Sequence, residues 1–220
     1  MADLHRTRGE AIEGKPRPVP PLGVPRSEEE EAGALSPSDA LRVEHDLIRR
    51  VIHAMGRSLH RLEGEERVDL MLIQRMVDFL ETYAHRVHHG KEEEILFREL
   101  HEKALEPPFR RTMEELAREH VEMRDLVGDL TEGLDAYLDG DEDGRTAMRE
   151  ALSGVMEVYP EHIEREEEDF FPEVEAYLEE REVRAVLEAM AGHDRAMIHE
   201  KYGSLAEDLA ARTEDWELPE

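Results

Sequence analysis

Cysteine is absent from the 220-residue chain. Disulfides, thiolate metal sites, iron–sulfur clusters and thiol catalysis are therefore excluded, and any bound metal must take nitrogen and oxygen ligands. Long apolar runs are also lacking, since no segment approaches the roughly 18 apolar residues of a membrane-spanning helix, and the first residues do not resemble a signal peptide. We expect a cytoplasmic protein with no membrane partner.

Positive charge and aromatic residues are scarce. The chain has 28 Lys and Arg against 56 Asp and Glu, a formal net charge of -28, and only 5% aromatic residues. The negative field repels nucleic acid and favours cations, so we expect no nucleic-acid partner. Charged residues (38%) and apolar residues (39%) occur in the mixture typical of long amphipathic helices. No feature of the sequence identifies a protein partner.

The periodicity of apolar residues predicts an all-α protein. Residues 1–36 are rich in proline and glutamate and are predicted to be a disordered tail. Ser36, Pro37 and Asp39 form a capping box that starts the first helix. Residues 37–175 are predicted to form an up-down-up-down four-helix bundle, and residues 176–220 an additional C-terminal helical extension. The helices are expected at 37–62, 66–103, between Pro108 and Asp139, at 145–171 and at 181–213.

An internal repeat carries the candidate chemistry. The segment HHGKEEEILF at 88–97 aligns without gaps on HIEREEEDFF at 162–171. In the preceding helices VEHDLIR around His45 corresponds to REHVEMRDL around His120. His45 and His88 are 43 positions apart, and His120 and His162 are 42 apart. The chain therefore reads as a duplicated helical hairpin, in which each copy supplies one His and then one His-x-x-x-Glu.

This spacing suits metal binding. Residues four apart on an α-helix are only about 40° apart around the axis and about 6 Å apart along it, so a histidine and a carboxylate point toward one place. Two copies offer four imidazoles and two carboxylates, enough for two metals bridged by the two glutamates. Such a nitrogen and oxygen set suits iron, manganese or zinc.

Two frames compete in the second helix, because both His88/Glu92 and His89/Glu93 have the required spacing. His89 aligns with the apolar Ile163 of the other copy, and its predicted helical face is the more polar one. We therefore favour His88 and Glu92 as the inward pair.

Other polar residues near the motifs have open roles. His85 is one turn from His88. It could be an extra metal ligand, or it could form a hydrogen bond to a residue that is a ligand. Tyr83 and Tyr159 flank the motif histidines and are either packing residues or hydrogen-bond donors to a bound ligand. His193 and His199 belong to the fifth helix and are expected at the surface.

The order H, H-x-x-x-E, H, H-x-x-x-E resembles the hemerythrin-like, or HHE cation-binding, family over roughly residues 41–172. The resemblance implies two iron ions in an oxo- or hydroxo-bridged diiron centre, with the two glutamates as bridges. The ligands it implies are His45, His88, Glu92, His120, His162 and Glu166.

One position departs from the oxygen-carrying hemerythrins, which have a further histidine four residues after the third-helix ligand. Here that position is Arg124. The resemblance implies a non-haem diiron protein that binds oxygen or a related small ligand, in oxygen or iron sensing, storage or the response to oxidative stress. The missing imidazole keeps open an enzyme that consumes peroxide or nitric oxide. A structural bundle with zinc or no metal is the third alternative.

Overall fold

The computed structural model describes residues 35–64 and 68–212, with side chains as far as residue 197. The predicted disordered tail therefore lies almost wholly outside the described residues. Every long element in the described part of the chain is a helix, which confirms the all-α prediction. In chain order the elements are α1 (Pro37–Glu63), α2 (Leu70–Phe79), η1 (Leu80–His89), η2 (Glu92–Phe97), α3 (Arg98–His101), α4 (Pro107–Leu138), α5 (Asp143–Arg165), η3 (Glu166–Phe170), α6 (Phe171–Val174), η4 (Glu175–Tyr177) and α7 (Glu180–Arg212).

Helix α1 starts as its sequence predicts. The Ser36 hydroxyl accepts a hydrogen bond from the Asp39 amide at 3.1 Å, and the Asp39 carboxylate accepts one from the Ser36 amide at 3.2 Å. Pro37, which has no amide hydrogen to satisfy, occupies the first helical position. This reciprocal cap fixes where the first helical column begins.

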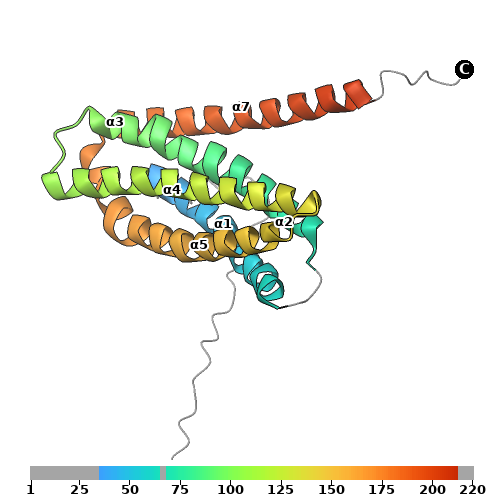
Figure 1. Ribbon diagram of the computed structural model, residues 1–220. Coiled ribbons are helices and arrows are strands. Elements are labelled where there is room, and N and C mark those ends of the chain that lie inside the picture. The colour runs from blue at the N-terminus through green and yellow to red at the C-terminus, as the bar shows by residue number, and fades with distance from the viewer. Residues whose placement is uncertain (1–34, 65–67, 213–220) are drawn as a thin grey trace, which may run out of the picture. The chain divides into compact units, whose positions relative to one another are not determined.

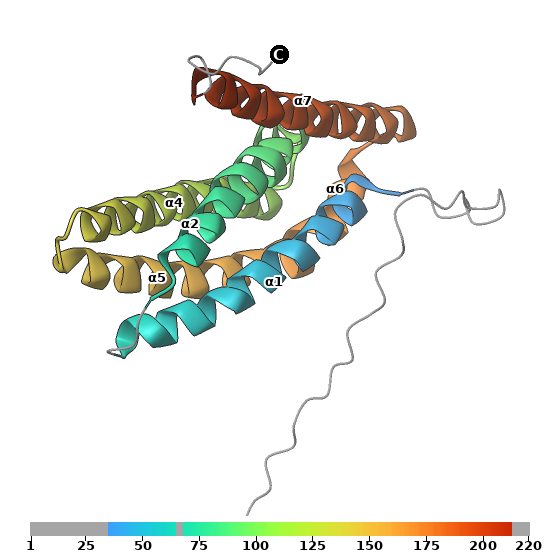
Figure 2. The same cartoon turned by 90° about the vertical axis from the view of Figure 1, so that its right-hand side faces the viewer.

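The helices form four columns, which Figures 1 and 2 show side by side. The first column is α1 and the third is α4. The second runs from α2 through η1 and η2 to α3, and the fourth from α5 through η3 to α6. Helix α4 packs along α5, α5 along α1, and α2 along α4. The columns thus enclose one interior, as the apolar periodicity predicted.

A layer of polar residues divides that interior into two apolar clusters. On one side of the layer are Ile48, Met55, Ile73, Leu80, Met123, Val127, Leu152 and Tyr159, among others. On the other side are Leu41, Leu96, Phe97, Leu100, Met113, Leu116, Phe170 and Phe171, among others. In α1, for example, buried His45 lies between Leu41 and Ile48. The two clusters hold the four columns in register on both sides of the layer.

Helix α7 covers the second column, where it contacts η1 and η2. Its Asp194 pairs with Lys91 at 2.8 Å, and its His193 contacts the carbonyl of Arg86 at 2.7 Å. A Cβ at Gly90 would come 2.8 Å from His193 Nε2, so the glycine allows this close approach. The predicted C-terminal helix thus packs on the outside of the bundle.

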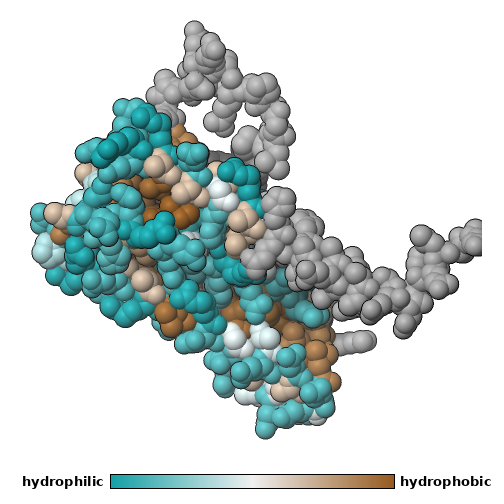
Figure 3. Space-filling view, turned by 90° about the horizontal axis from the view of Figure 1, so that it is seen from above, coloured by the Kyte–Doolittle hydropathy of each residue, from teal (hydrophilic) through white to brown (hydrophobic). Residues whose placement is uncertain are grey.

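The described residues present a mainly polar face in Figure 3. Figure 3 shows one face on which hydrophilic side chains dominate and apolar ones form small separate groups. Among the helices of the described ranges, none has both the length and the apolar character needed to cross a bilayer.

The close packing of α4 against the start of α5 requires a glycine at position 144. A Cβ at Gly144 would lie 2.5 Å from the backbone nitrogen of Tyr137, whereas a Cβ at Gly128 would meet nothing within 4 Å. We expect Gly144→Ala to lower the free energy of unfolding by about 1–3 kcal/mol through overpacking. Gly128→Ala should raise it by about 0.5–1 kcal/mol through helix propensity. Urea unfolding measures both, and equal effects would contradict the close approach.

Candidate metal centre

The polar layer between the two apolar clusters is deeply buried. Its histidines and carboxylates are at most 1% exposed: His45, His88, His89, His120, His162, Glu92 and Glu166. Buried carboxylates and imidazoles are costly unless each polar atom finds a partner or a cation. The contacts of each ring nitrogen and each carboxylate oxygen therefore show which of these atoms have partners within the protein and which are left for a cation.

Four of the histidines form two pairs whose Nε2 atoms face each other. His45 Nε2 lies 3.0 Å from His88 Nε2, and His120 Nε2 lies 3.1 Å from His162 Nε2. The first pair joins α1 to η1, and the second joins α4 to α5. Each copy of the repeated hairpin thus supplies one facing pair.

The other ring nitrogen of each histidine contacts a glutamate outside the layer. The Nδ1–carboxylate contacts are 2.9 Å for His45 with Glu167, 3.0 Å for His88 with Glu44, 2.8 Å for His120 with Glu93 and 2.8 Å for His162 with Glu119. An ionised carboxylate only accepts hydrogen bonds, so each Nδ1 carries the hydrogen. The Nε2 lone pairs are thereby directed into the layer, as in metal-binding histidines with an outer carboxylate.

A cation holds each of these outer carboxylates in turn. The pairs are Arg49 with Glu167, Lys91 with Glu44, Arg124 with Glu93 and Arg165 with Glu119. The four pairs repeat in the sequence, as Glu-His-x-x-x-Arg at 44–49 and 119–124 and as His-x-x-(Lys/Arg)-Glu-Glu at 88–93 and 162–167. Arg124, which the sequence marked only as a missing histidine, is therefore the counterpart of Arg49.

Each central carboxylate lies between the two histidine pairs. Glu166 is 3.1 Å from His45 and 3.3 Å from His162. Glu92 is 3.5 Å from His88 and 3.4 Å from His120. None of these contacts has the geometry of a hydrogen bond, so all four oxygens are buried without a hydrogen-bond partner. Such oxygens are free to serve as ligands.

Burial sets the protonation of the layer when no metal is bound. It raises the pKa of Glu92 well above its usual range, and the nearby Glu166 carboxylate adds to the rise. Burial also lowers the pKa of His88 to about 4, although the Glu44 hydrogen bond opposes it. Burial alone would lower the pKa of His45, but the Glu166 carboxylate at 3.1 Å and the hydrogen bond to Glu167 outweigh it and raise this pKa. Without a metal, a proton shared among these groups would offset part of the free-energy cost of burying them.

A metal ion satisfies the same groups more completely. Two imidazoles with their hydrogens on Nδ1 present two lone pairs to each other at about 3 Å, which is repulsive unless a proton or cation lies between them. Metal–nitrogen bonds of about 2.0–2.1 Å place adjacent ligand atoms at that separation. Two groups of four side chains have ligand atoms close enough for one ion: His45, His88, Glu92 and Glu166, and His89, Glu92, His120 and His162.

Comparison with known families identifies the arrangement. The family model of the hemerythrin HHE cation-binding domain matches residues 36–174, and a second match covers residues 113–220. The chain belongs to this family. No curated protein matches the chain. Membership implies metal binding, for which the two groups of side chains in the hemerythrin bundle are suitably placed.

The six residues singled out in the sequence all lie in the buried layer of the hemerythrin bundle: His45, His88, Glu92, His120, His162 and Glu166. In the rival frame Glu93 is not central, because its side chain is 33% exposed and pairs with His120 and Arg124. Their assignment as metal ligands stays a prediction.

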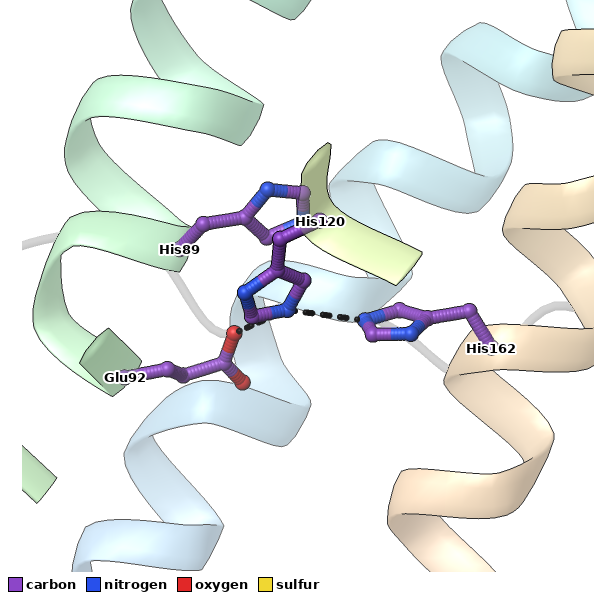
Figure 4. Close-up of side chains that lie close together, drawn as sticks. All are labelled: His89, Glu92, His120 and His162. Atoms are coloured by element: carbon purple, nitrogen blue, oxygen red, sulfur yellow. Dashed lines mark hydrogen bonds and ion pairs between the residues drawn. The ribbon is translucent and has the colours of Figure 1, made fainter. Parts of the chain in front are cut away.

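The expectation that His89 faces a polar side is wrong, because this residue is only 1% exposed. It ends the π-helical segment η1, in which the N–H of residue i+5 donates to the carbonyl of residue i. This spacing changes the faces that side chains share. Two further π-helical turns, η2 and η3, begin at Glu92 and Glu166. The prediction assumed an α-helical period throughout, and no signal in the sequence marked the π-turns. Figure 4 shows His89 beside Glu92, His120 and His162.

The remaining candidates take outer positions. His85 Nε2 contacts the Tyr159 hydroxyl at 2.7 Å, and burial lowers the pKa of His85 to about 4. Tyr83 stacks on Phe79 at 5.1 Å between ring centroids. His193 contacts the backbone of Arg86. The side chain of His199 lies outside the described residues.

The outer carboxylates predict how the metal-free protein responds to acid. Burial alone would raise the pKa values of Glu93 and Glu167, but hydrogen bonds from His120 and Arg124, and from His45 and Arg49, lower both to about 2. Their stabilisation is present above the usual carboxyl pKa of 4.5 and is lost as the pH falls toward about 2.

We therefore expect the double variant Glu93→Gln/Glu167→Gln to lose less free energy of unfolding than the parent between pH about 4.5 and about 2. After allowance for partial exposure, the difference is about 1 kcal/mol or less for each carboxylate. Glu94→Gln/Glu168→Gln, at exposed positions of the same repeat, is the matched control. Identical acid profiles for the two double variants in urea unfolding would refute the role of Glu93 and Glu167.

Proposed function

We propose that the chain is a non-haem diiron protein that binds oxygen or a related small ligand. The irons would be held by His45 and His88 in one half and by His120 and His162 in the other, with the carboxylates of Glu92 and Glu166 shared between them in an oxo- or hydroxo-bridged centre. The observation that carries the proposal is that the four histidines form two pairs with facing Nε2 atoms. Each central carboxylate, Glu92 or Glu166, lies close to one histidine of each pair.

The choice of iron rests on the family. Imidazole and carboxylate ligands suit iron, manganese or zinc, and the order of metal affinities does not select iron. A carboxylate that touches both histidine pairs suits two metals close enough to act together. When bound, an iron pair supplies redox chemistry toward oxygen, peroxide or nitric oxide, which supports a role in sensing, storage or the response to oxidative stress.

The protein surroundings favour a small ligand. Phe171 stacks on His45 at 5.5 Å, and Phe97, its counterpart in the repeat, stacks on His120 at 6.0 Å. These rings keep water away from one side of the layer. Two surface hollows, of about 320 and 340 Å³, reach the outer glutamates Glu93 and Glu119. Each hollow has room for a diatomic molecule or peroxide, and the second is also lined by His162.

Metal content and absorption test the centre. We expect full-length protein purified with iron to hold two irons per chain and to absorb in the near ultraviolet through oxo-to-iron charge transfer. His88→Ala and His162→Ala should each lose this signal, because each removes one of two facing nitrogens. His53→Ala, at an exposed position of α1, is the control and should keep it. Zinc or no metal in the parent protein, with unaltered variants, would reject the proposal in favour of a structural bundle.

A second experiment separates ligand binding from turnover. We expect the reduced, iron-loaded protein to form a stable adduct with oxygen or nitric oxide, without continuing consumption. The His88→Ala variant at the same total iron controls for free metal. Steady consumption of peroxide or nitric oxide by the parent alone, at rates proportional to protein, would instead establish the enzyme alternative.

A further inference from the structure

The histidines and glutamates that make up the two halves of the layer correspond one to one except at a single inward position. His45, Glu44 and Arg49 of the first half correspond to His120, Glu119 and Arg124 of the second, with the same contacts. The position after the paired histidine breaks the match. His89 follows His88, whereas Ile163 follows His162. Both residues are buried, so the layer contains a fifth imidazole on one side only.

The His89 ring packs against other rings, but one of its nitrogens has no partner. Its Nδ1 is buried without a hydrogen-bond partner, which costs free energy. The other half avoids this cost, because the equivalent residue is the apolar Ile163. Its ring lies 3.9 Å from the ring of His120 and 5.7 Å from that of His162. Stacking alone needs no imidazole, so the unpartnered nitrogen calls for another explanation.

A ligand atom of His89 is within 4.8 Å of ligand atoms of Glu92, His120 and His162, as Figure 4 illustrates. Two donors on opposite sides of one metal are about 4.2 Å apart when each bond is about 2.1 Å long. The 4.8 Å limit exceeds that span by about 0.6 Å. His89 would therefore enter the shell of an ion held by His120 and His162 by turning from its stacked position on His120.

We propose that His89 is a third nitrogen ligand of the metal held by His120 and His162, so that the two metals have unequal protein shells. This inference rests on the proposed dinuclear centre. The His120 half then has three imidazoles and the two shared carboxylates, and the His45 half has two imidazoles and the same carboxylates. The metal of the His45 half keeps more positions for a small ligand.

With His89 as a ligand, Arg124 no longer implies a centre with one imidazole fewer. At that position the oxygen-carrying hemerythrins have a histidine, and its absence led us to expect a centre with fewer nitrogens. Arg124 instead points outward and pairs with Glu93 at 2.8 Å. The fifth imidazole comes from the second helical column, so the nitrogen count is restored from a different helix.

Anaerobic titration of the metal-free, full-length protein with ferrous iron, followed by Mössbauer spectroscopy, tests the assignment. The parent should bind two irons in two distinguishable environments. His89→Ile introduces the residue found in the other half and should weaken one of the two irons at least about tenfold, with a change in one environment only. His89→Gln keeps a polar side chain at the position but lacks the imidazole. It should behave like His89→Ile, and it decides the question if the isoleucine variant does not fold.

Failure of this assignment is distinct from failure of the diiron proposal. If the parent does not bind two irons, the proposed function itself is rejected. If the parent binds two irons, and either folded His89 variant binds both with unchanged affinity and spectra, His89 is a packing residue and the diiron proposal survives. His53→Ile, at an exposed position of α1, controls for the loss of a surface imidazole and should match the parent.

Discussion

The burial of two carboxylates at the centre of a helical bundle is the constraint on which the structure depends. Glu92 and Glu166 are fully buried, and their oxygens have no hydrogen-bond partners. Uncompensated, each such charge costs several kcal/mol. The compensation is arranged in shells: imidazoles surround the central carboxylates, outer carboxylates hold the imidazoles, and arginine or lysine holds the outer carboxylates. Two apolar clusters close the arrangement from either side.

Duplication lets one short sequence unit build these shells twice. A Glu-His pair and the cation one turn later come from the first helix of each hairpin. A histidine, a cation and two adjacent glutamates come from the second. The adjacent glutamates have different roles, since Glu92 and Glu166 point inward while Glu93 and Glu167 hold histidines of the other hairpin. The hairpins are therefore joined by polar contacts in both directions.

Much of this arrangement could be predicted from the sequence because it depends on helical period and on repetition. The cap at Ser36, the helices and the inward placement of Glu92 and Glu166 all follow from short-range patterns. The partners of the outer carboxylates could not be predicted, because glutamate is abundant and a contact between helices leaves no local signature. The burial of His89, the rival to His88 in the sequence, was not expected for a different reason: π-helical turns move side chains to faces that an α-helical period does not give.

Each central glutamate contacts a histidine of the other hairpin, and this limits how early during synthesis of the chain a metal could be bound. Glu166 is the partner of His45, and Glu92 is the partner of His120, so neither hairpin contains all the proposed ligands by itself. A nascent chain has to include His162 before one group of four side chains is complete and Glu166 before the other is. Loading of the proposed centre would therefore require all four columns, and a bound ion would connect the first and last columns as a cross-link does.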